Sequence, residues 1–275
     1  MEITGRTRLT GLFGDPVIHS RSPAMHNAAY LHLRLPFVYL PFRVAGAQLP
    51  AAVRAIRALD MAGVNITVPH KEAVIPYLDR LDETALRCGA VNTIVNREGV
   101  LTGYNTDGLG FLDSLSELGF ELRKKKAVIL GAGGSARAVA AALLDLPVKS
   151  LLVLNRTVEK AKELAAALGA GDKISIFPLK ADAVPDLAEA ELVVNTLSVP
   201  FKQRGSRLVN LEQAKKALFY DLRYGSMPSG FLDYAKELGR PGVDGSGMLL
   251  HQGARAFTLI TGREAPLEVM RKALL

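Results

Sequence analysis

The sequence predicts an α/β protein of two domains, one of them built on a doubly wound parallel sheet. Short apolar runs that suit buried parallel strands alternate with longer segments whose apolar residues recur every three or four positions, as in helices. The connections between these segments are short, which favours right-handed crossovers. A length of 275 residues, 49% of them hydrophobic, suits two medium domains with large cores.

A glycine-rich turn near the middle of the chain joins an expected strand over residues 126–130 to an expected helix over residues 139–146. Between them Gly131, Gly133 and Ala136 form the pattern G-x-G-x-x-A. The first glycine permits a tight turn, the second lets the backbone approach a pyrophosphate, and the small third residue lets the helix pack on the strand. The phosphates then lie at the helix N-terminus. The pattern predicts a Rossmann-type dinucleotide site.

The segment after the next strand, residues 151–154, predicts which dinucleotide binds. An NAD site would carry an acidic residue there to bond the ribose diol. This chain reads Asn155-Arg156-Thr157 instead. An acid would repel a 2′-phosphate, whereas the guanidinium of Arg156 offers a fork of donors that matches one. The sequence therefore favours NADP.

The rest of this half continues the alternation. A helix is expected over 158–168, strands over 174–177, 192–195 and 218–221, and two final helices over 248–260 and 266–275. Residues 244–247, Asp-Gly-Ser-Gly, are expected to form a flexible joint before the first of these helices.

The N-terminal half has its own strands and helices. Strands are expected over 9–13, 37–44 and 61–71, followed by a strand pair over 91–96 and 100–102. Pro36 and Pro41 mark the second of these as an edge strand. Helices are expected over 49–59 and 109–118, and another with Pro23 in its first turn and Ser22 as its N-cap.

Polar residues at the ends of these strands are candidates for chemistry. Ser20 and Ser22 follow the first strand, where their hydroxyls suit a polyol or a carboxylate, although both also suit a turn and a cap. Thr67 and Lys71 lie at the carboxyl end of the third, where ligands bind in parallel sheets. Asp107 begins a helix, whose dipole favours a carboxylate whether or not it has a further role.

Composition and charge exclude several classes of protein. The net charge of +7 is dispersed apart from residues 123–126, and aromatic residues are few, so no nucleic acid is expected as a partner. A positive field also attracts small anions such as NADPH. No metal is expected, because the five histidines show no ligand spacing.

The single cysteine, Cys88, rules out an intrachain disulfide and fits a reducing compartment, so a cytoplasmic location is expected. The first ten residues lack the apolar core of a signal peptide, and no run of 18 apolar residues exists, so no membrane association is expected.

With these pieces in order, the sequence resembles the shikimate dehydrogenases along nearly its whole length. The matching words are F-G-D-P-V-I-H-S-R-S-P-A-M-H-N (13–27), G-V-N-I-T-V-P-H-K (63–71), G-A-V-N-T (89–93), N-T-D-G (105–108), G-A-G-G-S-A-R (131–137), N-R-T (155–157) and G-M-L-L-H-Q-G-A (247–254). One departure is Pro200, where the family often has glycine.

The resemblance implies the reversible NADPH-dependent reduction of 3-dehydroshikimate to shikimate. It also implies a discontinuous substrate domain (1–106 and 246–275), an NADP-binding Rossmann domain (107–245), and an active-site cleft between them. The protein is expected to be a monomer or a homodimer.

The resemblance further assigns roles to single residues. Lys71 and Asp107 would be the catalytic pair. The substrate would be bound by both of these with Ser20, Ser22, Thr67, Asn92, Tyr224 and Gln252. NADP would be bound by Gly131, Ala132, Gly133, Gly134, Ser135, Ala136, Asn155, Arg156, Thr157, Lys160, Gly245 and Met248.

Three alternatives remain beside this reading. One is a quinate or dual quinate/shikimate dehydrogenase, against which Ser20-x-Ser22 and N-R-T favour shikimate with NADP. Another is a catalytically silent regulator that binds metabolite and nucleotide, against which the presence of both Lys71 and Asp107 argues. The third is a folate dehydrogenase, which the seven words do not suit.

Overall fold

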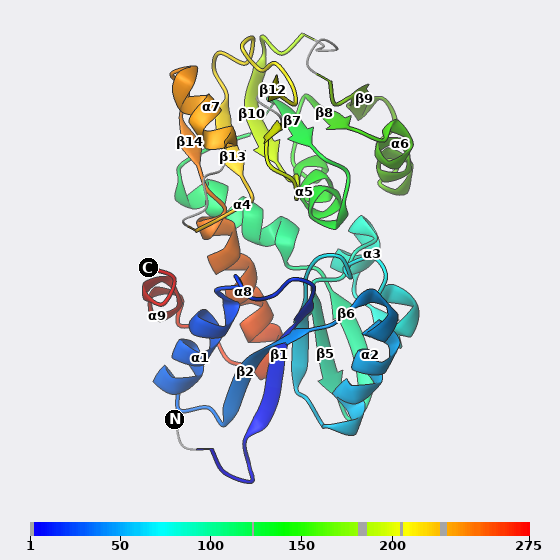
Figure 1. Cartoon of the computed structure of the whole chain (residues 1–275), viewed down its shortest axis with the longest axis vertical. Coiled ribbons are helices and arrows are strands. Elements are labelled where there is room, and N and C mark those ends of the chain that lie inside the picture. The colour runs from blue at the N-terminus through cyan, green and yellow to red at the C-terminus, as the bar shows by residue number, and fades with distance from the viewer. Residues whose placement is uncertain (1–2, 123, 181–185, 204–205, 226–229) are drawn as a thin grey trace. The chain divides into compact units, whose positions relative to one another are not determined.

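The structure of the chain, a computed structural model, describes residues 3–122, 124–180, 186–203, 206–225 and 230–275. It divides into two compact units, the first made of Met1–Phe111 with Leu249–Leu275 and the second of Leu112–Met248. The chain leaves the first unit inside helix α4 (Asp107–Glu117) and returns inside helix α8 (Ser246–Thr261). Each unit contains a six-stranded sheet with helices, which confirms the predicted α/β class (Figure 1).

The first unit is built on a mixed sheet whose strands follow the order β2-β1-β3-β5-β6-β4. Strand β1 is parallel to β2 and β3, whereas β5 runs antiparallel to both β3 and β6. The proline-containing strand β2 lies at an edge, as predicted. The strands are β1 (Arg8–Gly14), β2 (Phe37–Arg43), β3 (Gly63–Ile66), β4 (Arg80–Leu81), β5 (Thr93–Arg97) and β6 (Val100–Tyr104).

Helices cover both faces of this sheet. Successive residues of a strand point to opposite faces, so Phe13 packs with α2 (Leu49–Ala58) and α3 (Glu83–Cys88), whereas Leu12 packs with α1 (Ser22–His32), α8 and α9 (Leu267–Lys272). Figure 1 shows α1 and α2 on opposite sides of the strands. Two short 3₁₀ turns, Gly46–Gln48 and Ile75–Tyr77, complete the unit.

Two features of these helices differ from the predictions. Ser22 is not an N-cap: α1 begins at Ser22, its N-cap is Arg21, and no side chain caps it. Ser20 takes part instead, since its Oγ accepts the N–H of Ser22 at 3.3 Å. Helix α3 was not predicted, because six residues are too few to show a helical period. It is defined by its ends, with Asp82 accepting the N–H of Thr84 and Gly89 in the left-handed conformation.

The second unit is built on an all-parallel sheet with the order β14-β13-β10-β7-β8-β9. This order reverses between β7 and β10, which is the point where doubly wound sheets bind ligands. The strands are β7 (Lys126–Leu130), β8 (Ser150–Asn155), β9 (Ile174–Pro178), β10 (Ala190–Asn195), β13 (Leu218–Asp221) and β14 (Gly242–Val243). A small hairpin pairs β11 (Lys202–Gln203) with β12 (Ser206–Arg207).

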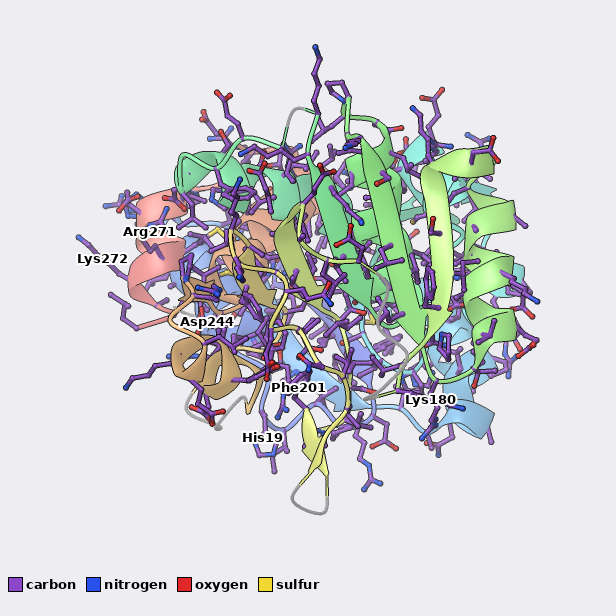
Figure 2. The ribbon with its side chains drawn as sticks, turned by 90° about the horizontal axis from the view of Figure 1, so that it is seen from above. His19, Lys180, Phe201, Asp244, Arg271 and Lys272 are labelled. Carbon is purple, nitrogen blue, oxygen red and sulfur yellow. The ribbon has the colours of Figure 1, made fainter. Side chains whose placement is uncertain are left out.

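The helices of this unit are α5 (Gly134–Leu144), α6 (Val158–Ala167) and α7 (Phe231–Glu237), with a 3₁₀ turn at Gly171–Lys173. One core cluster joins Val128 and Leu130 of β7 to Phe231 and Tyr234 of α7. Figure 2 labels a residue after each edge strand of this sheet, Asp244 after β14 and Lys180 after β9.

The segment 244–247, which the sequence predicted to be a flexible joint, is partly helical. Ser246 and Gly247 belong to α8, and both carboxylate oxygens of Asp244 accept hydrogen bonds from Ser246 at 3.0 Å. A Cβ on Gly247 would lie 2.3 Å from Ser114 Oγ, so this glycine permits close packing. A bilayer crossing would need a longer and more apolar helix than any in the described part of the chain.

Candidate functional site

Four strands of the first sheet have a terminus at the same end of the sheet, called its carboxyl edge here, and most of the predicted substrate residues lie on the segments at this end. Strands β1, β3 and β6 end there and the antiparallel β5 begins there, because the register pairs Thr93 with both Asn65 and Tyr104. The segments that follow β1, β3 and β6, or precede β5, carry Ser20, Ser22, Thr67, Lys71, Asn92 and Asp107.

Lys71 and Asp107 form an ion pair at this edge. Lys71 Nζ lies 2.5 Å from Asp107 Oδ2, and the two side chains are only 13% and 5% exposed. Lys71 lies in the turn after β3, whereas Asp107 is the first residue of α4 and donates its N–H to Asn105 Oδ1 at 3.0 Å. Because both side chains are largely buried, the ion pair interacts more strongly than a solvent-exposed pair would.

Asn92 joins this pair through its amide group. Its Nδ2 donates to Asp107 Oδ1 and Thr106 Oγ1, both at 2.8 Å, and to Gln252 Oε1 at 3.3 Å. Its Oδ1 accepts the N–H of Thr106 at 2.9 Å. Asn92 therefore presents a fixed donor to Asp107 Oδ1, while Lys71 pairs with Oδ2.

Gln252 reaches the group from α8. A Cβ on Gly110 would lie 2.4 Å from the backbone nitrogen of Gln252, so the glycine in α4 is what lets α8 approach. Gln252 Nε2 donates to the carbonyl of Leu249 at 2.9 Å, which leaves Oε1 to face Asn92.

The loops after β1 and β3 pack directly on each other. Thr67 donates its N–H to the carbonyl of Phe13 at 2.9 Å, and a Cβ on Gly14 would lie 2.3 Å from the Thr67 methyl group. Ser20 and Thr67 are half-buried and Ser22 is buried. The three hydroxyls thus lie on segments at the same sheet edge as Lys71.

The glycine turn of the second unit follows β7. Gly131 has φ +114°, a conformation that only glycine adopts readily, and Thr196 packs against it after β10. Gly133 instead faces open space, since a Cβ there would meet no atom within 4 Å. Gly133 is the N-cap of α5, whose N-terminus has no side-chain cap, and Ala136 is fully buried. A helix end of this kind suits an anionic ligand. Ala132, Gly134 and Ser135 complete the turn.

A tight turn with an exposed cation follows β8. Asn155 Nδ2 donates to the carbonyl of Thr157 at 2.8 Å, which closes the turn before α6. Arg156 and Thr157 are exposed, as is Lys160 in the first turn of α6. A guanidinium therefore stands where an NAD site would carry its acid.

Asn195 and Asp221 join the ends of β10 and β13. Asn195 Nδ2 donates to Asp221 Oδ1 at 3.0 Å, and both side chains are 1% exposed or less. The same carboxylate oxygen accepts the N–H of Arg223 at 3.0 Å. These contacts hold the segment that leads to Tyr224, which is half-buried, at the carboxyl edge of the sheet.

Gly245 and Met248 lie beside this segment. A Cβ on Gly245 would lie 2.2 Å from the carbonyl oxygen of Leu222, so only glycine fits there. Met248 donates its N–H to the hydroxyl of Tyr220 at 3.2 Å. Burial raises the pKa of Tyr220, which keeps the hydroxyl neutral.

Sequence reasoning missed several buried polar residues around both groups: Asn65, Thr93, Thr106, Asn195 and Asp221. The available signal was a polar side chain inside or at the end of an otherwise apolar strand. Because buried polar groups are nearly always hydrogen-bonded, each such residue indicates partners elsewhere in the chain. The sequence does not say which partners these are.

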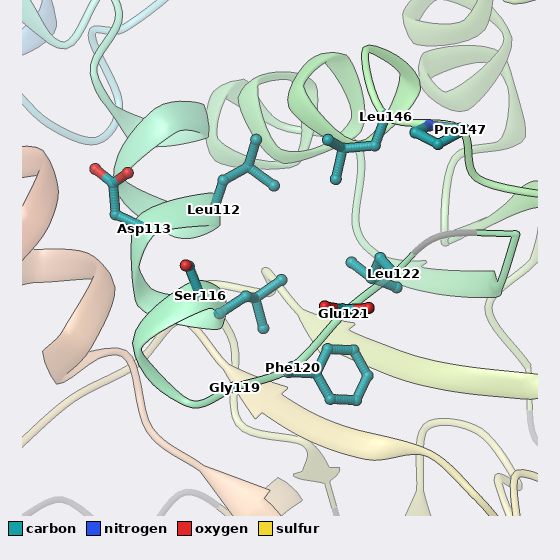
Figure 3. Close-up of a pocket in the computed structure, with 10 residues that line it drawn as sticks. Leu112, Asp113, Ser116, Gly119, Phe120, Glu121, Leu122, Leu146 and Pro147 are labelled. Carbon is teal, nitrogen blue, oxygen red and sulfur yellow. The ribbon is translucent and has the colours of Figure 1, made fainter.

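A hollow of about 660 Å³ lies elsewhere in the second unit (Figure 3). It lies toward the amino ends of β7 and β8, opposite the glycine turn, and the predicted cofactor residues do not line it. Its lining residues are Leu112, Asp113, Leu115, Ser116, Gly119, Phe120, Glu121, Leu122, Leu146 and Pro147. Among the described residues, no three His, Cys, Asp or Glu side chains form a group that could hold a metal ion.

Three stretches of the chain match known families. Residues 12–94 match the shikimate dehydrogenase substrate binding domain, residues 114–222 match the shikimate / quinate 5-dehydrogenase family, and residues 245–275 match the shikimate 5'-dehydrogenase C-terminal domain.

Whole proteins are similar as well. The chain is 48% identical to the shikimate dehydrogenase (NADP(+)) of Moorella thermoacetica, over 100% of this chain and 95% of that protein. The shikimate 5-dehydrogenase of Thermus thermophilus, solved with NADP(H) and shikimate, is 36% identical with a TM-score of 0.85 over 98% of both chains. The quinate dehydrogenase of Corynebacterium glutamicum, solved with NAD, is 32% identical with a TM-score of 0.85 over 97% of this chain and 98% of that one. This chain belongs to the shikimate dehydrogenase family.

Proposed function

We propose that this chain catalyses the reversible NADPH-dependent reduction of 3-dehydroshikimate to shikimate, with Lys71 and Asp107 as its catalytic pair. The observation that carries the proposal is their shielded ion pair, with Nζ and Oδ2 2.5 Å apart, at an edge that also carries hydroxyl and amide groups. Membership of the family, whose relatives are named as NADP-dependent shikimate dehydrogenases, supports both the reaction and the cofactor.

The residues of the second unit fit NADP. The open space over Gly133 and the uncapped N-terminus of α5 suit a pyrophosphate, and the exposed Arg156 suits a 2′-phosphate. We assign the pyrophosphate to Gly131, Ala132, Gly133, Gly134, Ser135 and Ala136. The phosphorylated ribose is assigned to Asn155, Arg156, Thr157 and Lys160, and the nicotinamide end to Gly245 and Met248.

Lys71 is the proton donor in this proposal. When bound, the cofactor supplies the hydride. Reduction of the ketone leaves a negative charge on the substrate oxygen, and the ammonium of Lys71 stabilises that charge and transfers a proton from Nζ to it. Asp107 holds the ammonium through Oδ2, and Asn92 holds Asp107 through Oδ1. In the oxidation direction the hydroxyl proton returns to Nζ.

The substrate is polar and anionic, and the edge of the first sheet offers matching groups. We assign substrate contacts to Ser20, Ser22, Thr67, Lys71, Asn92, Asp107, Tyr224 and Gln252. Hydroxyl groups bind a carboxylate by donating hydrogen bonds, and the amides bind ring hydroxyls by donating or accepting them.

The two units are assigned different tasks. We propose that the first unit is the substrate domain, which the sequence placed at 1–106 and 246–275, and the second the NADP domain, which it placed at 107–245. The structure divides the chain a few residues further on, inside α4 and α8. A monomer or homodimer in the cytoplasm is part of the same proposal. The single cysteine fits a reducing compartment.

The test is a set of steady-state rates with shikimate and quinate, each with NADP and NAD. We expect the highest kcat/KM for shikimate with NADP. Quinate is the alternative substrate, since a quinate dehydrogenase is among the similar structures. A higher kcat/KM with quinate would make the protein a quinate dehydrogenase. Binding of NADP without turnover of either compound would favour a regulator.

A further inference from the structure

A line of buried hydrogen bonds leads from β2 to Asn92. Tyr39 donates its hydroxyl proton to Asn65 Oδ1 at 2.9 Å, and Asn65 Nδ2 donates to Thr93 Oγ1 at 3.0 Å. Thr93 Oγ1 then donates to Asn92 Oδ1 at 2.9 Å. Tyr39 and Thr93 are fully buried, and Asn65 is 7% exposed. Neither Tyr39 nor Thr93 has a part in the reaction as derived above.

The direction of this line is fixed. A threonine hydroxyl has one proton, and because Asn65 donates to Thr93, that proton is left for Asn92. If the Asn92 amide turned over, its NH₂ would meet the N–H of Thr106, and its oxygen would face the Asp107 carboxylate. Both contacts would be repulsive. The N–H of Thr106 and the Asp107 carboxylate therefore select the orientation in which Nδ2 faces Asp107, and the proton that Thr93 donates to Oδ1 supports the same orientation.

Thr93 adds to the contacts of Thr106 a second close donor to the side-chain oxygen of Asn92. A carbonyl oxygen has two lone pairs, so a second donor on it further restrains rotation of the amide about the bond to Cβ. The N–H of Thr106 and the hydroxyl of Thr93 both donate to Asn92 Oδ1 at 2.9 Å, closer than the Thr106 hydroxyl at 3.3 Å. The Thr93 hydroxyl thus helps to hold the plane of the amide, and that plane sets where Nδ2 points.

We propose that Thr93 is a positioning residue for the reaction. Its hydroxyl fixes the Asn92 amide, which holds Asp107 Oδ1 and leaves Oδ2 for Lys71. Asn65 and Tyr39 support the hydroxyl from behind. The inference deepens the proposed function and rests on it, because the effect on turnover requires that Lys71 and Asp107 are the catalytic pair.

The test compares two buried threonines of the same sheet. Thr93→Val removes the hydroxyl beside Asn92. Thr10→Val is the matched control, since Thr10 is also fully buried but bonds Tyr30 and the carbonyl of Val38. With shikimate and NADP we expect Thr93→Val to lower kcat by roughly 3-fold to 30-fold with KM within about 2-fold, the range for loss of one or two buried hydrogen bonds. Thr10→Val should stay within about 2-fold in kcat, and Thr93→Ser should restore it.

A double-mutant cycle separates positioning from general packing. If Thr93 acts through Asn92, Thr93→Val lowers kcat in the unmodified enzyme and changes nothing further in the Asn92→Ala background. A loss of the same size in both backgrounds would overturn the proposal, as would a kcat for Thr93→Val equal to that of Thr10→Val.

A second measurement does not depend on activity. The side-chain amide resonances of Asn92, identified by their loss in Asn92→Ala, should shift in Thr93→Val and in Tyr39→Phe but not in Thr10→Val. Resonances that stay unchanged in both Thr93→Val and Tyr39→Phe would overturn the positioning role. An unmodified protein that does not oxidise shikimate would contradict the proposed function instead, and the resonances would still decide whether Thr93 orients Asn92.

Discussion

Gly131 and Thr196 touch across the point where the strand order of the second sheet reverses. A Cβ on Gly131 would stand 2.4 Å from Thr196 Oγ1, and that hydroxyl is held in place by a 2.8 Å hydrogen bond to the carbonyl of Leu130. A Cβ on Gly133, two residues further on, would meet no atom within 4 Å. The two glycines of one motif therefore meet different requirements, one for packing within the protein and one for space beside it.

Replacing each glycine by alanine should separate these requirements. Gly131→Ala should lower the free energy of unfolding by at least about 1–3 kcal/mol, because it forces a positive φ on alanine and collides with Thr196. Gly133→Ala should leave unfolding nearly unchanged and weaken NADP binding, since its methyl group fills the space proposed for the pyrophosphate. Urea unfolding and NADP titration of both variants measure this. Equal stability losses would contradict it.

Arg156 is expected to set the choice of cofactor. A charge-assisted hydrogen bond contributes roughly 1.5 to 3 kcal/mol, so Arg156→Ala should raise KM for NADP by about 10-fold to 150-fold. KM for NAD should hardly change, because NAD has no 2′-phosphate. Lys160→Ala, which removes another exposed cation nearby, serves as the control and should have the smaller effect. Equal losses with both cofactors would show that Arg156 has a structural role.

Lys71 is expected to act mainly in the transition state. General acid–base contributions are roughly 10² to 10⁴-fold, so Lys71→Ala should lose at least about two decades of kcat with shikimate binding largely intact. Kinetics at saturating shikimate and NADP measure this. If Lys71 only binds the shikimate carboxylate, KM rises and kcat is preserved, and that pattern would refute the catalytic assignment.

His26 should make stability depend on pH. Its ring is buried against Tyr39, with centroids 4.4 Å apart, and burial lowers its pKa from 6.5 to about 3. The unfolded chain therefore binds a proton below about pH 6.5 that the folded chain does not bind. This difference lowers the free energy of unfolding as pH falls from about 6.5 towards 3, by up to about 1.4 kcal/mol per pH unit.

The measurement for His26 is urea unfolding at several pH values between 7 and about 4.5, in the range set by these pKa values. His26→Phe keeps an aromatic ring against Tyr39 and cannot take up a proton. Its free energy of unfolding should fall less steeply with decreasing pH than that of the unmodified chain. Parallel curves for the two proteins would show that His26 titrates alike in the folded and unfolded states.

The sequence by itself predicted features that depend on neighbours within a few residues. The period of apolar residues predicted the helices, and the spacing of the glycines predicted the turn. The position of Arg156 after a strand predicted its contact with the cofactor. These properties are local, because φ/ψ preferences and side-chain spacing along one element determine them. The ends of elements were less predictable. Ser22 looked like a cap, yet the hydroxyl of Ser20 was the one that bonded to the backbone.

Only the tertiary structure decided which distant groups meet. Lys71 and Asp107 are 36 residues apart, and the register of β3, β5 and β6 brings their segments to one edge. The resemblance named the pair, but not the donors that orient it. Asn92, Thr93 and Asn65 are bonded to one another because antiparallel pairing sets Asn65 opposite Thr93. A buried polar side chain needs a partner, and only the packed sheet determines which partner is within hydrogen-bonding distance.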